Sequence, residues 1–289
     1  MKKLLILGGS GFIGSSIVDY GINKNLIKNK INEIYILSRS VKFSQNKKKH
    51  ISITYINKNM LNVSKLPQVD YIIYCLKNSN IKISNSYFNQ FLKILKNFKK
   101  KPKILFTSSG AVYGKNINKK KDMESKKIDN ILIDNFVGYK KKYAKEKVFL
   151  EEKFKELAKK NYNVSIARCY TFIGKNIIYY NYAISDLINA ANSKKKIILN
   201  SHIDVFRSYM HSDDLSNWLM TILKNSNTKC PIYNVGSDKV INLKSLAEKI
   251  GIMTNKKISI KIKKRKKFYY YVPISYTHLR SHETDPYRL

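Results

Sequence analysis

The chain has 289 residues, and 43% of them are hydrophobic, which excludes a wholly disordered protein. Its formal net charge of +37 is extreme, yet lysines occur throughout the predicted helices and loops. A nucleic-acid binder would concentrate its basic residues on one face with aromatics between them, so we expect no specific nucleic-acid partner. The local clusters at 47–49, 119–121 and 261–267 are interpreted as loops or termini that favour an anionic substrate.

Other classes are excluded by what the chain lacks. Its three cysteines, Cys75, Cys169 and Cys230, are widely spaced, so we expect neither a disulfide framework nor a metal site, and a reducing cytoplasm fits best. The apolar run after Met1 is cut by glycines at Gly8, unlike a signal peptide. No stretch is long and apolar enough to predict a membrane span.

The first motif is a glycine-rich turn. The apolar run 4–7 is followed by Gly8-Gly9-Ser10-Gly11-Phe12-Ile13-Gly14 and by the amphipathic stretch 13–22. A strand, a glycine turn and a helix start in this order predict the first unit of a dinucleotide-binding sheet. Gly8 allows the tight turn, Gly11 lets pyrophosphate approach the backbone, and Gly14 allows close packing of helix on strand. The helix N-terminus offers N–H groups and a partial positive charge to the phosphates.

Strands and helices then alternate along the chain. This alternation predicts an α/β fold, a doubly wound parallel Rossmann sheet, with ligands beyond the carboxyl ends of its strands. We predict strands at 33–37, 51–56, 71–75, 103–107, 164–169, 197–199 and 232–235, and helices at 84–98, 139–159, 184–191, 212–223 and 243–250. The last helix is expected to be capped by Asn242 and to end at Gly251, and 114–138 is expected to be an irregular excursion.

The end of the second predicted strand bears on the choice of cofactor. An acidic residue there would bind the adenosine ribose hydroxyls and favour NAD, but the chain has Ser38 and Arg39. A guanidinium suits a ribose phosphate, so NADP(H) is favoured over NAD(H). The alternative is that Arg39 stacks on the adenine or lies in solvent.

A candidate acid–base pair lies on the helix predicted at 139–159. Tyr143 and Lys147 are four residues apart and therefore share a helix face. An ammonium at that distance would lower the pKa of the phenol, which would make Tyr143 a general acid or base. Such pairs arise by chance in a chain rich in both residues, and a solvated helix face is the alternative.

Further motifs strengthen the catalytic interpretation. Hydroxyls leave a predicted core strand at Thr107-Ser108-Ser109-Gly110-Ala111-Val112-Tyr113-Gly114. Together with the glycine turn and the Tyr143–Lys147 pair, this segment resembles the extended short-chain dehydrogenase/reductase family of NAD(P)-dependent sugar epimerases and dehydratases. Three later segments also resemble the family, at 168–174, 207–215 and 233–237.

The resemblance implies roles for matched positions. Ser109 would bond the reacting oxygen, Tyr143 would transfer the proton, and Lys147 would bind the nicotinamide ribose. Arg207 would clamp a substrate diphosphate, and Thr171 stands where many members have a substrate-contacting asparagine. Contacts to the cofactor are implied for Gly8, Ser10, Gly11, Phe12, Ile13, Gly14, Ser38, Arg39, Asn59, Met60, Tyr143 and Lys147.

The resemblance also implies domain boundaries and partners. Residues 1–172 would form the dinucleotide-binding domain, with 203–236 packing back on it, and 173–202 and 237–273 would bind substrate. The segment 274–289 fits no element of the family, so we expect a non-native or disordered tail and a substrate region that is truncated. His278 and His282 in that tail are not expected to bind a metal. Homodimers are implied by the resemblance alone.

Departures from the family pattern narrow the activity. Dehydratase members carry an Asp-Glu pair directly after the catalytic hydroxyl residue, where this chain has Gly110-Ala111. We therefore expect a nucleotide-sugar 4-keto reductase or 4-epimerase and not a 4,6-dehydratase. Two alternatives are a reductase of a non-sugar carbonyl, against which Arg207 argues, and a non-catalytic nucleotide-binding protein, against which the Ser109–Tyr143–Lys147 set argues.

Overall fold

A computed structural model describes residues 1–22, 30–39, 51–115, 117, 122–123, 127–175, 177, 182–193 and 196–274. The strands are β1 (Lys2–Leu7), β2 (Ile31–Ser38), β3 (Ser52–Asn57), β4 (Tyr71–Tyr74), β5 (Lys103–Ser109), β6 (Asp122–Met123), β7 (Asn163–Cys169), β8 (Phe172–Ile173), β9 (Ile197–Ser208), β10 (Met210–His211), β11 (Ile232–Val235), β12 (Val240–Asn242), β13 (Ile258–Tyr271) and β14 (Pro273–Ile274). The helices are α1 (Phe12–Ile22), α2 (Ile81–Leu95), α3 (Asn130–Asp134), α4 (Gly138–Lys159), α5 (Ala183–Asn192), α6 (Ser212–Lys224) and α7 (Leu243–Thr254), with 3-10 turns η2 (Met60–Asn62) and η3 (Gly110–Tyr113).

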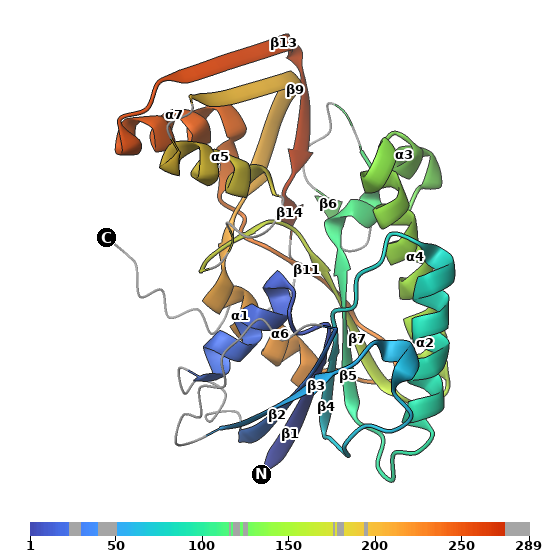
Figure 1. The fold of residues 1–289 in the computed structure, drawn as a ribbon. Coiled ribbons are helices and arrows are strands. Elements are labelled where there is room, and N and C mark those ends of the chain that lie inside the picture. The colour runs from blue at the N-terminus through green and yellow to red at the C-terminus, as the bar shows by residue number, and fades with distance from the viewer. Residues whose placement is uncertain are drawn as a thin grey trace.

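The main sheet has seven strands in the order β11-β7-β5-β4-β1-β2-β3. All of its pairings are parallel, so the predicted doubly wound Rossmann architecture is confirmed. In Figure 1, α1 and α6 lie on one face of this sheet, and α2 and α4 lie on the other.

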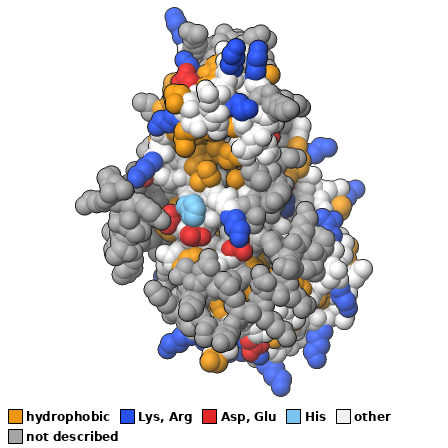
Figure 2. Space-filling view, turned by 60° about the vertical axis from the view of Figure 1, so that its left-hand side comes forward, with side chains coloured by type: hydrophobic (Ala, Val, Ile, Leu, Met, Phe, Trp, Pro, Cys, Tyr) orange, Lys and Arg blue, Asp and Glu red, His pale blue; other side chains and the backbone are white. Residues whose placement is uncertain are grey.

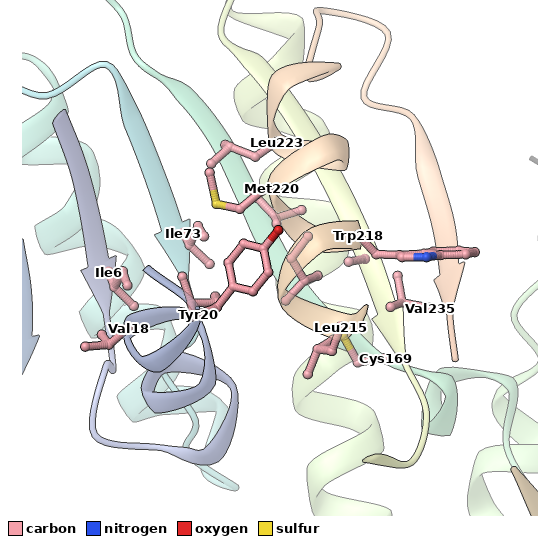
Figure 3. Close-up of a cluster of buried hydrophobic side chains, with 14 of the residues drawn as sticks. Ile6, Val18, Tyr20, Ile73, Cys169, Leu215, Trp218, Met220, Leu223 and Val235 are labelled. Carbon is pink, nitrogen blue, oxygen red and sulfur yellow. The ribbon is translucent and has the colours of Figure 1, made fainter. Parts of the chain in front are cut away.

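Apolar runs in the central strands serve both faces. Leu4 and Ile6 of β1 belong to the cluster beneath α1 and α6, whereas Leu5 and Leu7 belong to the cluster beneath α2 and α4. Successive side chains of a strand point to opposite faces, so a strand covered on both sides is apolar throughout. Figure 3 shows Tyr20 of α1 directed toward α6, beside Met220. The Tyr20 hydroxyl donates to Asn217 Oδ1 at 3.2 Å.

A smaller sheet in the order β12-β9-β13 lies with α5 and α7 at the opposite end of the molecule (Figure 1). Within the stretch 203–236, residues 203–208 belong to β9 of this sheet, whereas β11 joins the main sheet. The parallel pairing of β9 with β13 sets Arg207 directly opposite Tyr271. This register brings the end of the smaller sheet to the candidate site described below.

Four details differ from the sequence predictions. The basic run 261–267 is part of β13 and not a loop, and β9 runs twelve residues where only 197–199 was expected. Helix α7 passes Gly251 and ends at Thr254, followed by Asn255 in the left-handed conformation, although Asn242 does cap its start. The described part of 114–138 contains β6 and α3. Strand β13 was not predicted because its many lysines hide the alternation of apolar and polar residues. Ile258 and Ile260 of this strand both pack against the smaller core.

Several expectations concern residues outside the described ranges. The basic clusters at 47–49 and 119–121 and the tail from 275 onward, with His278 and His282, lie there. Figure 2 shows Lys and Arg side chains scattered over the described part of one face, without a single continuous patch. Among the described helices, none has the length and apolar character that crossing a membrane requires.

Candidate functional site

The glycine turn between β1 and α1 is shaped by close backbone contacts. Gly8 has a φ of +86°, and a Cβ added there would lie 2.9 Å from the carbonyl carbon of Cys75. A Cβ on Gly14 would lie 2.5 Å from the Cα of Gly9, so its close contact is with the turn and not with the strand as expected. A Cβ on Gly11 would meet only the Gly8 carbonyl oxygen, at 3.5 Å. Gly8 and Gly14 are thus required by packing, whereas Gly11 keeps open the approach to the first turn of α1.

The residues expected around this turn fit a dinucleotide. Ser38 at the end of β2 lies with its Oγ 2.6 Å from that of Ser10, which ties the strand end to the glycine turn. Arg39 follows as an exposed cation. After the next strand, β3, Asn59 caps η2 by accepting from the Leu61 N–H at 3.2 Å, and Met60 is buried. The glycine turn with its open backbone and the exposed cation are features that suit the polar and anionic parts of a nicotinamide dinucleotide.

Ser109 ends β5 at the carboxyl edge of the sheet and is 5% exposed. Its Oγ accepts from the Ala111 N–H at 3.2 Å and lies 3.1 Å from the hydroxyl of Tyr271. Tyr143, on α4, also shares a hydrogen bond with Ser109. Two phenols from distant parts of the chain therefore meet at one serine hydroxyl.

Lys147 lies one turn beyond Tyr143 and is 3% exposed. Its Nζ lies 5.7 Å from the centroid of the Tyr143 ring and 4.9 Å from that of Phe106. The structure thus brings Ser109, Tyr143 and Lys147 together, as their spacing indicated. Their roles in catalysis remain predictions.

The pKa of Tyr143 differs from the sequence expectation. Burial raises this pKa well above its ordinary value, and Tyr271 adds to the rise, while the bond with Ser109 opposes it. The sequence predicts that Lys147 lowers this pKa toward neutrality. In the structure the desolvation of the phenol is the largest effect, and it acts in the opposite direction.

Two neighbours of Tyr143 were not predicted from the sequence. Tyr139 stacks on Tyr143 with ring centroids 6.0 Å apart, and Lys77 Nζ lies 5.3 Å from each of these two rings. Tyr139 is 53% exposed, whereas Tyr143 is turned toward Ser109. The two tyrosines of α4 therefore differ in their surroundings, because Tyr143 bonds with Ser109 and Tyr139 is exposed to solvent.

Arg207 and Thr171 lie where β9 approaches the main sheet. The guanidinium carbon of Arg207 lies 5.0 Å from the Tyr271 ring centroid and 5.2 Å from that of Tyr269. Neighbouring cations share this region, because burial, Arg207 and Lys115 all lower the pKa of Lys140. The Thr171 hydroxyl donates to the carbonyl oxygen of Ser208, so its donor is already used by the backbone. A cluster of cations favours an anionic ligand.

Below Ser109, a buried network fixes the turn that follows β5. Arg168 donates to both carboxylate oxygens of Glu151, at 3.0 and 2.7 Å, and to the Tyr113 hydroxyl at 2.8 Å. Ser108 donates to Glu151 at 2.6 Å, and Tyr113 donates to Asn234 at 3.0 Å. The network therefore holds the residues on both sides of Ser109 and Gly110.

The chain matches a known protein family and resembles solved structures. The family model described as NAD dependent epimerase/dehydratase family matches residues 4–236. No curated protein matches the chain by sequence. The structure resembles dTDP-glucose 4,6-dehydratase from Bacillus anthracis str. Ames in complex with NAD, with a TM-score of 0.71 and 17% identity, covering 95% of this chain and 88% of that one.

Two epimerases are similar to the same extent. UDP-glucose 4-epimerase from Thermotoga maritima, with UDP-glucose, gives a TM-score of 0.70 at 15% identity, covering 95% of this chain and 90% of that one. UDP-N-acetylglucosamine 4-epimerase from Methanobrevibacter ruminantium M1, in complex with UDP-N-acetylmuramic acid, gives 0.68 at 18% identity, covering 94% and 89%. At these identities the likeness shows the shared fold.

Proposed function

Because the chain belongs to the NAD dependent epimerase/dehydratase family, we propose that it transfers a hydride at a ring carbon of a nucleotide-activated sugar, as a 4-keto reductase or a 4-epimerase. The observation that carries this proposal is the convergence of Tyr143 and Tyr271 on Ser109, with Lys147 beneath Tyr143, at the carboxyl edge of the parallel sheet. Ligands of such sheets bind at this edge.

Each residue would have a defined task. Ser109 Oγ would bond the reacting sugar oxygen, and Tyr143 would donate a proton to it in reduction or take one from it in oxidation. Lys147 would bind the ribose next to the nicotinamide and stabilise the phenolate that forms. The bound nicotinamide would supply or accept the hydride. The protonated state of Tyr143 in the free chain suits reduction of a ketone, which consumes that proton.

The cofactor would be held by the glycine turn and the strand ends beside it. The first turn of α1 would receive the pyrophosphate, for which Gly11 leaves room. Arg39 would pair with a ribose phosphate, which is why we propose NADP(H) over NAD(H). Asn59 and Met60 would lie along the adenine.

The substrate would lie between Ser109 and the smaller sheet. Arg207, with Lys140 nearby, would bind the diphosphate. Dehydration is not proposed because Gly110 and Ala111 offer no carboxylate. A side chain at 110 would also need space that is taken, since a Cβ there would lie 2.6 Å from the Tyr170 ring.

Cofactor turnover tests the proposal. Purified protein is mixed with NADPH and a panel of 4-keto sugar nucleotides, and separately with 4-hydroxy sugar nucleotides, and NADPH fluorescence is followed with product analysis. Net oxidation of NADPH identifies a reductase, and interconversion of 4-epimers without net oxidation identifies an epimerase. NADPH binding without turnover of any member of the panel, in either direction, would contradict both.

A further inference from the structure

Glu146 is a buried carboxylate that the proposed reaction does not use. It directly precedes Lys147 on α4 and has no exposed surface. Its Oε1 accepts from Ser84 of α2 at 2.9 Å, and the backbone N–H of Asn78 donates to the same carboxylate. Its Oε2 is buried and has no hydrogen-bond partner among the described residues. An unsatisfied buried oxygen of this kind is costly and needs a compensating charge.

The compensating charge is the ammonium of Lys147. Its Nζ lies 3.9 Å from Glu146 Oε2, which is within ion-pair distance but too long for a hydrogen bond. Lys147 is itself buried beside the ring of Phe106, where an ammonium is kept from water and gains from a nearby opposite charge. Each charge therefore stabilises the other. Because the ammonium makes no hydrogen bond to Glu146, its N–H donors stay available for other partners.

We propose that Glu146 is a positioning residue: its carboxylate holds the buried Lys147 ammonium by charge and limits how strongly that ammonium acts on Tyr143. The inference deepens the proposed function and rests on it. Glu146, Lys147 and Tyr143 then form a relay along α4, in which the carboxylate acts on the ammonium and the ammonium acts on the phenol. Glu146 touches neither substrate nor cofactor in this scheme.

Other groups facing this carboxylate come from three elements. Lys77 precedes α2 and is attracted to Glu146, whereas Tyr74 of β4 has its pKa raised by burial and by Glu146. Glu146 also contributes to the raised pKa of Tyr143. The groups to be considered in any pH dependence are therefore Lys147, Tyr143, Lys77, Tyr74 and the uncharged donors Ser84 and Asn78.

The substitution Glu146→Gln removes the charge and retains the shape and the acceptor for Ser84. We expect the NMR signal of the Lys147 side chain to move, because the charge that faces its Nζ at 3.9 Å is lost. The signal is followed by NMR of isotope-labelled lysine side chains, with Lys147→Met identifying the resonance. The measurement does not require turnover, so it can fail or succeed independently of the proposed function.

A kinetic readout follows the relay to Tyr143. In the alcohol-oxidation direction Tyr143 must lose its proton, so activity rises with pH through its pKa. Removal of the Glu146 charge lowers that pKa, and we expect the midpoint of the profile to move toward lower pH. Ser84→Ala is the matched control, because it removes the hydrogen bond but leaves the charge, and should not shift the midpoint.

The competing interpretation is that Glu146 only supports packing. It predicts that Glu146→Gln and Ser84→Ala lower activity alike and leave both the Lys147 signal and the midpoint unchanged. That result would overturn the proposal. If Glu146→Gln does not fold, Glu146→Asp retains the charge, and the proposal requires it to keep the parent's profile. A shifted midpoint in Glu146→Asp, with the Lys147 signal unchanged, would also contradict it.

Discussion

Helix α4 carries two fully buried carboxylates whose surroundings differ. Around Glu151, both carboxylate oxygens are bonded to Arg168, and Ser108 supplies a further donor. Around Glu146, Ser84 and the Asn78 N–H donate to the carboxylate, but among the described residues its Oε2 has no hydrogen-bond partner and lies 3.9 Å from the Lys147 ammonium. The two regions lie five residues apart on one helix, and each is packed against the sheet.

The difference shows how one helix serves two purposes. A buried charge with every bonding direction filled fixes the position of its partners, but has no interaction left for a reaction. A buried pair that is only partly satisfied keeps an ammonium available to respond when charge develops nearby. The Glu151 region therefore holds the turn of Ser109 in place, and the Glu146 region adjusts the groups that would do chemistry there.

The largest effect is expected from Tyr143→Phe, which removes the proton donor of the incompletely paired region. General acid–base catalysis contributes about 10²- to 10⁴-fold, so turnover should fall by that factor while NADPH affinity stays within a few fold. Steady-state kinetics and a fluorescence titration measure both. Tyr139→Phe is the control, since its ring stacks on Tyr143 but is 53% exposed. Equal losses in both variants would place the acid elsewhere.

Glu151→Gln tests the fully paired region through stability. Removing one charge leaves the buried Arg168 without its partner, and the free energy of unfolding should fall by about 3 kcal/mol. Urea denaturation measures the change. Glu152→Gln on the same helix breaks only an exposed pair with Lys155, 2.7 Å apart, and should cost less than about 1 kcal/mol. If the two variants are equally stable, Glu151 does not hold the turn as described.

Arg207→Ala probes the cation that joins the smaller sheet to the site. Loss of hydrogen bonds to a charged group costs about 1.5–3 kcal/mol, so KM for the nucleotide sugar should rise roughly 10- to 100-fold, with a smaller change in kcat. Lys266→Ala is the control, because it removes an exposed charge from the neighbouring strand β13. A KM that does not change in Arg207→Ala would favour a substrate without a diphosphate.

Features that depend on neighbouring residues could be predicted from the sequence, whereas contacts between distant segments could not. The glycine turn, the parallel strands and the Tyr143–Lys147 pair are local patterns, and the structure places them as the patterns indicated. Tyr271 was not identified as a site residue, because its position depends on the pairing of β13 with β9 more than 60 residues away. The direction of the Tyr143 pKa differs from the prediction, since spacing reveals the ammonium but not the desolvation of the phenol, which is the largest effect. The partners of Glu146 and Glu151 likewise come from α2 and β7, which no pattern within α4 reveals.

Arg39 extends the comparison to a charge that is not buried. It is exposed at the end of β2, so water competes for its guanidinium, and a contact with a ribose phosphate gains little compared with a desolvated pair. We therefore expect Arg39→Ala to weaken NADPH binding by roughly fivefold, about 1 kcal/mol, and to leave NADH binding unchanged. Fluorescence titrations at low and high salt measure this, and the difference should shrink as salt screens the contact. Lys30→Ala, at the opposite end of the same strand, should alter neither affinity. An equal loss for NADPH and NADH in Arg39→Ala would mean that the guanidinium stacks on the adenine, which both cofactors share.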